Sequence, residues 1–208
     1  MKICYNYTVM GVFMYSKYIK RGLDCFISLC GLIILSPILL VISICIKCTS
    51  KGPVLFKQER TGRNNVPFKI LKFRTMRIDT PHDIPTHLLE NPDMYITSVG
   101  KFLRKTSLDE LPQLWNIFVG DMAIVGPRPS LLNQYDLNAL RDQNGASSVR
   151  PGLTGLAQIS GRDELEISMK ACLDGKYVEN IHFLEDVRLF FGTFVSVLRH
   201  DGVKEGKS

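Results

Sequence analysis

The sequence has no charged side chain between residues 25 and 46, although the chain of 208 residues carries 26 Lys and Arg and 20 Asp and Glu. Outside this stretch, charged residues make up about a quarter of the chain, which is normal for a soluble domain. This distribution excludes a protein that crosses the membrane many times and a disordered chain. The length suits one globular domain with one accessory element, and the uncharged stretch is that element.

Several signatures of common catalytic and binding sites are also missing. There is no G-x-S-x-G of serine hydrolases and no G-x-G-x-x-G that opens a helix after a strand. The four histidines are scattered, and the C-x-x-C at residues 45–48 has no second pair beside it. The six cysteines are therefore expected to be small apolar residues in a reducing compartment.

Acidic residues are scarce in the first part of the chain. Residues 1–77 hold 13 Lys and Arg against only Asp24 and Glu59, a net charge of +11, whereas residues 78–208 carry a net charge of −5. A basic surface of this kind attracts anions. Because an apolar stretch lies inside the basic part, lipid head groups or a diphosphate are favoured, and no nucleic-acid partner is expected.

The uncharged segment of 22 residues makes a helix of about 33 Å, long enough to span a bilayer. Two observations oppose a simple span. Ser36 and Pro37 lie at its middle, and Pro37 cannot donate to the carbonyl of Ile33, so the helix should kink where the Ser36 hydroxyl partly compensates. Basic residues flank both ends, and such flanks prefer the cytoplasmic side. We therefore predict a re-entrant helix that leaves by the face through which it entered.

The remaining sequence predicts a mixed domain with more helix than strand. Residues 53–58 and 67–73 favour two short strands across a turn at Gly62 and Asn64-Asn65, which indicates a hairpin. Residues 78–97 predict a loop or a lid, and residues 143–162 predict a structured loop. Helices are expected at residues 98–106, 107–118, 130–141 and 183–199, the last of them in the core or on the bilayer surface.

Two adjacent carboxylates give the densest functional signal. Ser107 and Glu110 match the S-x-x-E capping box, so a simple helix start is one interpretation of this segment. The alternative is that Asp109 and Glu110 place a nucleophile and a metal ligand beside a diphosphate at a helix N-terminus. Cations and the helix dipole would then favour the ionised carboxylate, which is the form that attacks phosphorus.

Cationic residues provide two weaker signals. Lys72 and Arg74 are two positions apart, so on a strand they share a face and would grip phosphate oxygens, unless they form a solvated edge or contact lipid head groups. Arg150 and Arg162 bracket a glycine-rich segment that suits an anion-binding nest.

In this setting the sequence resembles the bacterial sugar transferases that are small monotopic phosphoglycosyl transferases, polyprenyl-phosphate sugar-1-phosphate transferases. The resemblance runs from residue 17 to about residue 199, in motif order, and the full series is very specific. The motifs that carry it are KRGLD (20–24), Ser36-Pro37, GPVLFKQERTG (52–62), KFRTM (72–76), SLDELPQ (107–113), GDM (120–122), VGPRP (125–129) and PGLTG (151–155).

The resemblance implies a Mg²⁺-dependent transfer of a sugar 1-phosphate from a UDP-sugar to undecaprenyl phosphate, with release of UMP. Such a reaction is the first membrane step of bacterial glycan synthesis, of glycoprotein, O-antigen, capsule or exopolysaccharide. The implied partners are the UDP-sugar, undecaprenyl phosphate and inner-membrane lipid, with homo-oligomerisation left open. The catalytic domain is expected on the cytoplasmic face of the inner membrane.

The resemblance also implies residue roles. Asp109 is the nucleophile of a ping-pong reaction that forms a covalent aspartyl phosphosugar, and Glu110 with Asp109 holds Mg²⁺. The residues expected near the phosphates and the nucleotide are Lys72, Arg74, Arg104, Arg128, Arg162 and Asp174. The predicted fold is α/β and mainly helical, a compact catalytic domain with a short β-hairpin, a re-entrant kinked membrane helix and amphipathic interfacial helices. Its expected parts are an extension (1–16), the membrane helix (17–48), the catalytic domain (49–200) and a tail (201–208).

The sequence departs from the family pattern at two places. Residues 1–16 have no recognised counterpart, and Met14 is an alternative start. Ile181-His182 replaces a frequent Trp-Ser, which bears on the membrane contact and on the choice of sugar. Two functions of other classes remain open at this point: a membrane-tethered protein that binds anionic lipid, and a glycosyltransferase that releases UDP. The sequence does not identify the sugar.

Overall fold

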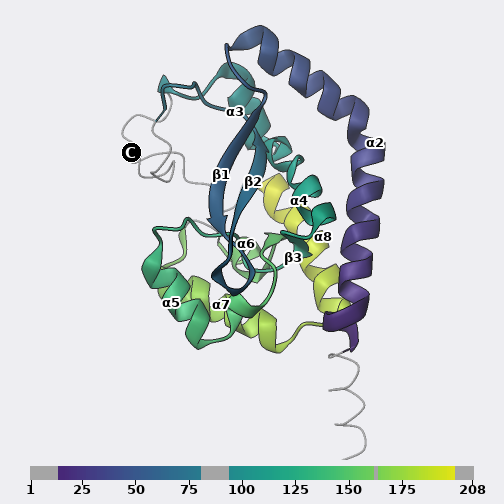
Figure 1. Cartoon of the computed structure of the whole chain (residues 1–208), viewed down its shortest axis with the longest axis vertical. Helices are drawn as coiled ribbons and strands as arrows, with labels where there is room; N and C mark the ends of the chain where they lie inside the picture. Colours follow the sequence, from purple (N-terminus) through teal and green to yellow (C-terminus); the bar gives the residue numbers. More distant parts are fainter. Residues whose placement is uncertain (1–13, 81–93, 162–163, 200–208) are drawn as a thin grey trace, which may run out of the picture.

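The computed structural model describes residues 14–80, 94–161 and 164–199, and its longest element is a single bent helix. After a π-helical turn, η1 (Tyr15–Ile19), helix α2 (Lys20–Thr49) runs for 30 residues. Figure 1 shows it turning near its middle. Pro37 lies inside the helix, and the Ser36 hydroxyl donates to the Ile33 carbonyl at 2.8 Å. The predicted bend, with the hydroxyl serving the carbonyl that proline leaves without a donor, is confirmed.

The predicted hairpin is also present. Strands β1 (Leu55–Thr61) and β2 (Pro67–Phe73) pair antiparallel, with Leu55 opposite Phe73 and Thr61 opposite Pro67. The tip, η2 (Arg63–Asn65), places Asn64 and Asn65 in the left-handed region, at φ 52° and 59°. Asparagine tolerates that region better than most residues, which is why this pair marks the turn.

A second strand pair was not predicted, and one of its strands lies in the segment 143–162 that was predicted as a loop. Strand β3 (Ala123–Val125) pairs in parallel with β4 (Gly152–Thr154). Gly126 and Gly152 make this possible, because a Cβ on Gly126 would lie 2.5 Å from the Arg150 carbonyl oxygen. The prediction of a loop over 143–162 was therefore wrong at β4 and at the short helix α6 (Leu156–Ile159).

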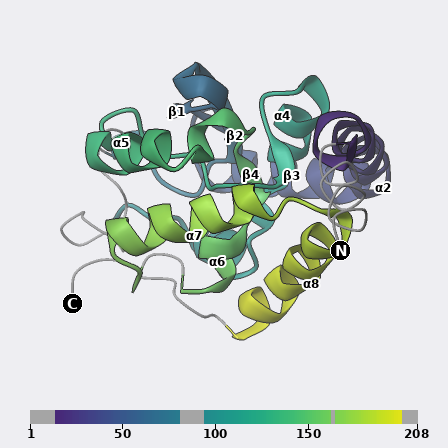
Figure 2. The same ribbon diagram turned by 90° about the horizontal axis from the view of Figure 1, so that it is seen from below.

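The other helices surround these two strand pairs. Of the predicted helices, the one at 130–141 begins later, the one at 107–118 is divided by a turn, and the last is confirmed. The helices are α3 (Ser98–Lys105), α4 (Gln113–Val119), α5 (Tyr135–Gln143), α7 (Ile167–Glu179) and α8 (Phe183–Arg199). Helices α5 and α7 lie side by side (Figure 2), and a 3₁₀ turn, η6 (Ala146–Ser148), follows α5.

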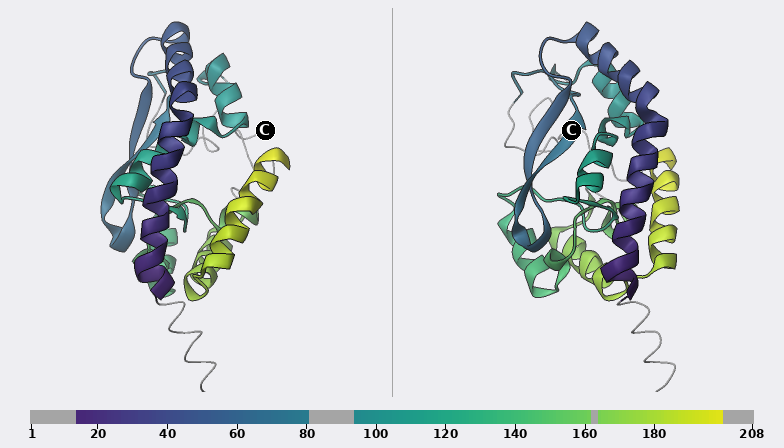
Figure 3. Two further views of the ribbon diagram at one scale, coloured as in Figure 1. Left: turned by 90° about the vertical axis from the view of Figure 1, so that its right-hand side faces the viewer. Right: turned by 45° about the vertical axis from the view of Figure 1, so that its right-hand side comes forward.

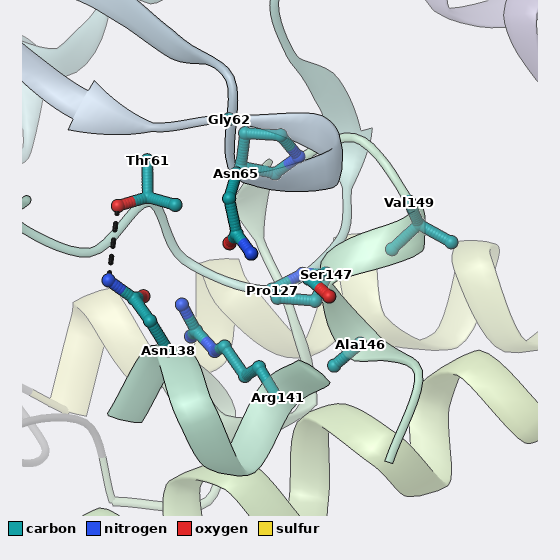
Figure 4. A pocket seen from close by; sticks show the side chains of 10 residues that line it. Thr61, Gly62, Asn65, Pro127, Asn138, Arg141, Ala146, Ser147 and Val149 are labelled. Atoms are coloured by element: carbon teal, nitrogen blue, oxygen red, sulfur yellow. Dashed lines mark hydrogen bonds between the residues drawn. The ribbon is translucent and has the colours of Figure 1, made fainter. Parts of the chain in front are cut away.

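The hairpin tip is fastened to α5. Asn138 donates to the Thr61 hydroxyl at 3.3 Å, and Figure 4 shows the two side chains facing each other beside Arg141. Asn65 donates to the Asp142 carboxylate at 2.8 and 3.0 Å. The hairpin is thus held at its tip by α5, while its base continues into the site described below.

Both ends of α2 contact the same globular body. Near the N-terminal end, Arg21 donates to the carbonyls of Ile117 and Phe118, at 2.6 and 2.8 Å, and the buried Asp24 accepts from the Ile124 amide at 3.0 Å. Those two carbonyls end α4, where a cation is favourable. At the C-terminal end, Ile46 is buried beside Phe73 and Leu103.

A buried carboxylate joins the N-terminal end of α2 to the end of the chain. Asp186 of α8 accepts from Tyr15 at 2.6 Å, from Tyr177 at 2.7 Å, and from the ammonium group of Lys20. Burial raises the pKa of both tyrosines, and the Asp186 charge raises it further. In Figure 3, α8 begins beside the lower end of α2 and then diverges from it.

We predict that Asp186→Asn destabilises the fold by about 3–5 kcal/mol, because the partly buried Lys20 ammonium loses its salt-bridge partner and two buried tyrosine hydroxyls lose a charged acceptor. The measurement is thermal unfolding in detergent. The matched control is Glu185→Gln at the adjacent position, where the partner Arg188 has a side chain that is 60% exposed. That surface pair contributes about 0–1 kcal/mol. Equal losses in the two variants would contradict a special role for Asp186.

Candidate active site

The two carboxylates lie on a tight turn, not at the start of a long helix. Helix α3 ends at Lys105, Ser107 takes the left-handed conformation at φ 55°, and a 3₁₀ turn, η5 (Leu108–Glu110), follows. Ser107 forms no side-chain cap, so the capping-box interpretation is wrong. Pro112 then precedes α4. Leu108 and Leu111 pack against the buried cluster of Ile42, Ile46, Phe73 and Leu103, which anchors the turn.

Glu110 is held by two cations on one oxygen. Its Oε1 accepts from Lys72 Nζ and from Arg128 Nη2, both at 2.8 Å, and its side chain is 13% exposed. Burial alone would raise the pKa of this carboxyl, but Arg128 and Lys72 prevail and hold it well below its usual range. Glu110 is therefore a fixed anion over the ordinary pH range.

Asp109 behaves in the opposite way. Burial raises the pKa of Asp109 to about 6; the negative charge of Glu110 adds to this, while Lys72, Arg104 and Arg128 oppose it. Cations favour the ionised form of Asp109 as expected, but desolvation outweighs them, so the pKa of Asp109 is raised instead of lowered. Adjacent carboxylates with pKa values pushed apart are typical of catalytic pairs.

Lys72 reaches Glu110 because β2 is fixed to α4. Asn116 of α4 accepts from the Leu71 amide at 2.9 Å and donates to the Lys69 carbonyl at 2.9 Å, so its side chain pairs with the outer edge of β2. The next residue of the strand, Lys72, then points toward the turn that carries Glu110.

The arginines of the site come from two further segments. Arg104, in the last turn of α3, donates to the Thr75 hydroxyl at 2.9 Å. Helix α3 approaches Thr75, two residues after β2, closely because Gly100 has no side chain. A Cβ on Gly100 would lie 2.0 Å from the Thr75 carbonyl oxygen. Arg128 lies between Pro127 and Pro129 in the loop after β3, and the fixed φ of proline limits the movement of this loop.

Comparison with known proteins agrees with the motifs found in the sequence. The model of the family described as bacterial sugar transferase matches residues 15–200. The chain belongs to the bacterial sugar transferase family.

Curated relatives of this sugar transferase act in exopolysaccharide synthesis or on lipid carriers. It is 40% identical over 190 residues to the exopolysaccharide production protein PSS of Rhizobium leguminosarum bv. phaseoli, covering 86% of this chain and 95% of that protein. It is 42% identical over 181 residues to the UDP-glucose:undecaprenyl-phosphate glucose-1-phosphate transferase of Klebsiella pneumoniae, covering 84% and 39% of the two chains.

A third relative is the undecaprenyl-phosphate galactose phosphotransferase of Salmonella typhimurium (strain LT2), 37% identical over 202 residues. The match covers 90% of the sugar transferase and 42% of the relative. The chain therefore spans nearly the whole of the Rhizobium protein and less than half of the other two.

Two predicted site residues of the sugar transferase, Arg74 and Asp174, form their assigned bonds away from the carboxylate cluster. Arg74 donates instead to the Ser50 and Lys51 carbonyls, at 2.9 and 2.7 Å, and so caps the C-terminal end of α2. Lys72 and Arg74 therefore grip no common partner. Asp174 forms a buried ion pair with Arg141, at 2.6 Å, between α7 and α5. Arg162 lies outside the described residues.

Two residues of the site were missed from the sequence. Asn116 fixes the edge of β2, and Arg60 of β1 lies close enough to Glu110 and Arg128 for their charges to affect its pKa. Strand alternation offers a signal for Arg60, because Gln58 and Arg60 share a face with the positions opposite them, Ile70 and Phe68, and hence with Lys72. Nothing in the sequence marks Asn116.

We predict that the pKa of Asp109 in the metal-free protein lies near 6, and that Lys72→Met raises it, because Lys72 is the cation that lowers it most. The carboxyl then loses its proton over a higher pH range than a typical Asp. Carbon NMR of labelled carboxyl groups measures both effects. Lys69→Met is the control, since Lys69 lies on the opposite face of β2. An Asp109 pKa at or below the ordinary range would contradict the assignment.

Proposed function

We propose that this sugar transferase moves a sugar 1-phosphate from a UDP-sugar to undecaprenyl phosphate and releases UMP. The observation that carries the proposal is the pairing of Asp109 with Glu110 among Lys72, Arg104 and Arg128. Such a cluster suits a diphosphate, whose charge the cations neutralise as the transferred phosphoryl group is attacked. The names of the relatives, which specify undecaprenyl phosphate, support the same reaction.

Asp109 is the proposed nucleophile. Its carboxylate oxygen forms a bond to the phosphorus that carries the sugar, and the bond from that phosphorus to the oxygen of UMP breaks, so UMP leaves with the electron pair. An oxygen of undecaprenyl phosphate then attacks the same phosphorus, and the bond to Asp109 breaks, which restores the carboxylate. With a pKa of about 6, Asp109 is mostly ionised at neutral pH and ready to attack.

The residues of the site fit Mg²⁺. Magnesium is typically held by one or two carboxylates, together with waters and substrate phosphates. Lys72 and Arg128 both bond Oε1 of Glu110, which leaves Oε2 and the Asp109 carboxylate as the oxygen ligands. When bound, the ion would neutralise phosphate charge. The described residues contain no group of three His, Cys, Asp or Glu that could hold a metal, so substrate oxygens would complete the shell.

We predict that Asp109→Asn abolishes UMP release and the phosphosugar adduct, because an amide does not attack phosphorus. The wild-type protein is incubated with UDP-glucose, UDP-galactose and N-acetylated UDP-amino sugars, including diacetamido-trideoxy sugars, and undecaprenyl phosphate. Nucleotides are separated by chromatography and the protein is weighed by mass spectrometry. Asp142→Asn is the control, since the Asp142 carboxylate bonds Asn65 of the hairpin tip and Ser147, neither of which belongs to the carboxylate turn.

The outcomes separate three functions. UMP release with an adduct in wild type and none in Asp109→Asn supports the proposal. UDP in place of UMP indicates a glycosyltransferase that leaves the phosphate behind. A protein that binds anionic lipid but releases no nucleotide is the membrane-tethered binding protein. A full-level adduct in Asp109→Asn contradicts the role of that residue.

The proposed location is the membrane surface, with α2 inserted as a re-entrant helix. Helix α2 is the one helix in the described part of the chain that is long and apolar enough to cross a bilayer. Its exposed side carries a large apolar surface, which is unusual in a soluble protein. The largest exposed side chains there are Phe26, Ile33, Ile34, Leu40 and Val41.

Contacts at both helix ends support the re-entrant arrangement over a span. Arg21 and Asp24 bond the globular body at one end, and Ile46 packs against it at the other. A helix that crossed the bilayer would place these ends on opposite sides, and one of the two contact sets would be lost. Phe191 and Phe194 of α8 and Phe102 of α3 are more than half exposed, which suits helices lying in the interface.

We predict that cysteines at Ser16 and Lys51 are labelled from the same side of the membrane. Each substitution is made in a chain from which all native cysteines except Cys172 have been removed. Cys172 is exposed on α7 and reports the side on which the globular body lies. An impermeant maleimide is applied to vesicles of both orientations. Labelling of Ser16→Cys and Lys51→Cys from opposite sides would show a spanning helix.

A further inference from the structure

Arg60 is a charged residue beside the candidate site that the proposed reaction leaves without a role. It lies on β1 and forms an isolated antiparallel bridge with Leu131, while the adjacent Thr61 amide donates to the Ser130 carbonyl at 3.0 Å. The segment after Arg128 therefore runs along the free edge of β1. Arg60 is the point at which the hairpin meets the loop that carries Arg128.

The Arg60 guanidinium is held on two sides. Nη2 donates to the Gln58 side-chain oxygen at 2.6 Å, and Nη1 donates to the Pro129 carbonyl at 3.4 Å. Gln58 lies two residues away on the same face of β1, and Pro129 directly follows Arg128 in sequence. The planar fork of arginine makes both bonds at once, which lysine cannot reproduce.

The rest of this environment is unfavourable for a residue that only stabilises the fold. Nε of Arg60 is buried and has no hydrogen-bond partner among the described residues. Burial lowers the pKa of Arg60 to about 10, and the like charge of Arg128 contributes, with Glu110 as the opposing anion. A buried donor without an acceptor and two neighbouring like charges both cost free energy, so this arrangement calls for an explanation.

The surroundings of the two carboxylates carry an excess of positive charge. Lys72, Arg104, Arg128 and Arg60 act on Asp109 or Glu110, so four cations surround two carboxylates within the described ranges. An incoming polyanion relieves the repulsion between the cations. A site that is too positive when empty gains more from a diphosphate than a balanced one.

We propose that Arg60 is a positioning residue for Arg128: its bond to the Pro129 carbonyl and the repulsion between the two guanidinium groups hold Arg128 against Glu110, where Arg128 meets a diphosphate. This inference rests on the proposed function for the identity of the diphosphate, a UDP-sugar. Arg60 acts through Arg128, because its own Nε is buried. The partly exposed Arg128, 42% by side-chain area, is the group that meets the substrate.

The first experiment measures the binding of inorganic pyrophosphate to the full chain in detergent by calorimetry, without divalent cations. Arg60→Met is expected to weaken binding roughly tenfold to a hundredfold, the range of one lost charged hydrogen-bonding contact. Arg60→Lys keeps the charge without the fork and should lie between. Arg63→Met is the matched control: it lies on the same hairpin and contacts the Ser148 carbonyl at 2.8 Å.

Kinetics give a second readout that a merely structural role would not produce. With the UDP-sugar that the wild type accepts, Arg60→Met should raise KM for the nucleotide sugar by a similar factor and leave kcat within about threefold. If Arg60→Met does not fold, the same binding and kinetic measurements are made on Gln58→Leu. This variant removes the acceptor that orients Arg60 without changing any charge. A weaker effect in the same direction is expected.

Unchanged pyrophosphate affinity in the folded Arg60 variants, or an equal loss in Arg63→Met, overturns the inference. So does a wild-type protein without measurable pyrophosphate affinity. A wild type that binds pyrophosphate through Arg60 but releases no UMP overturns only the proposed function. A wild type that releases UMP while Arg60→Met binds pyrophosphate normally overturns only the role of Arg60.

Discussion

Polar contacts fix both ends of an otherwise apolar helix to one globular body. At the start of α2, Lys20, Arg21 and Asp24 bond Asp186, two α4 carbonyls and the β3 amide of Ile124. At its end, Arg74 caps the carbonyl of Ser50. Everything else lies between these two anchors. Because the bend at Pro37 lets one helix reach both of them, the apolar face of α2 and the carboxylate turn have a fixed relation to each other.

The site itself depends on three chain segments that meet at one carboxylate oxygen. The hairpin supplies Lys72, the loop after β3 supplies Arg128, and the turn between α3 and α4 supplies Glu110. Each segment is held independently: the hairpin by Asn116, the loop by its flanking prolines, and the turn by Leu108 and Leu111, which pack against a buried cluster. Asp109 is therefore partly desolvated on a rigid frame, and its carboxyl, the proposed nucleophile, has a higher pKa than that of Glu110.

Much of this could be predicted where local chemistry decides the structure. The Ser36-Pro37 bend, the Asn-rich hairpin turn and helix α8 follow from residues that act on their own neighbours. The sequence was misleading where distant contacts decide. Ser107 matches a capping box, yet Leu108 and Leu111 turn the chain into the core instead. Short β4 exists only because β3 lies beside it. Arg74 and Asp174 were predicted near the phosphates, the first from its spacing to Lys72 and the second from the family resemblance, and neither signal shows that each bonds a distant segment instead.

The Asp186 contacts also set an order on synthesis. Lys20 and Tyr15 bond Asp186, which the ribosome adds 166 and 171 residues after them. At ~5–20 residues per second, the ribosome needs roughly 10–30 s to reach it. During that interval α2 exists without α8, so the ammonium group of Lys20 and the hydroxyl of Tyr15 lack the Asp186 carboxylate. In the proposed membrane arrangement, lipid would cover the apolar side of α2 during this interval, and α8 would then complete the contacts at the N-terminal end of α2.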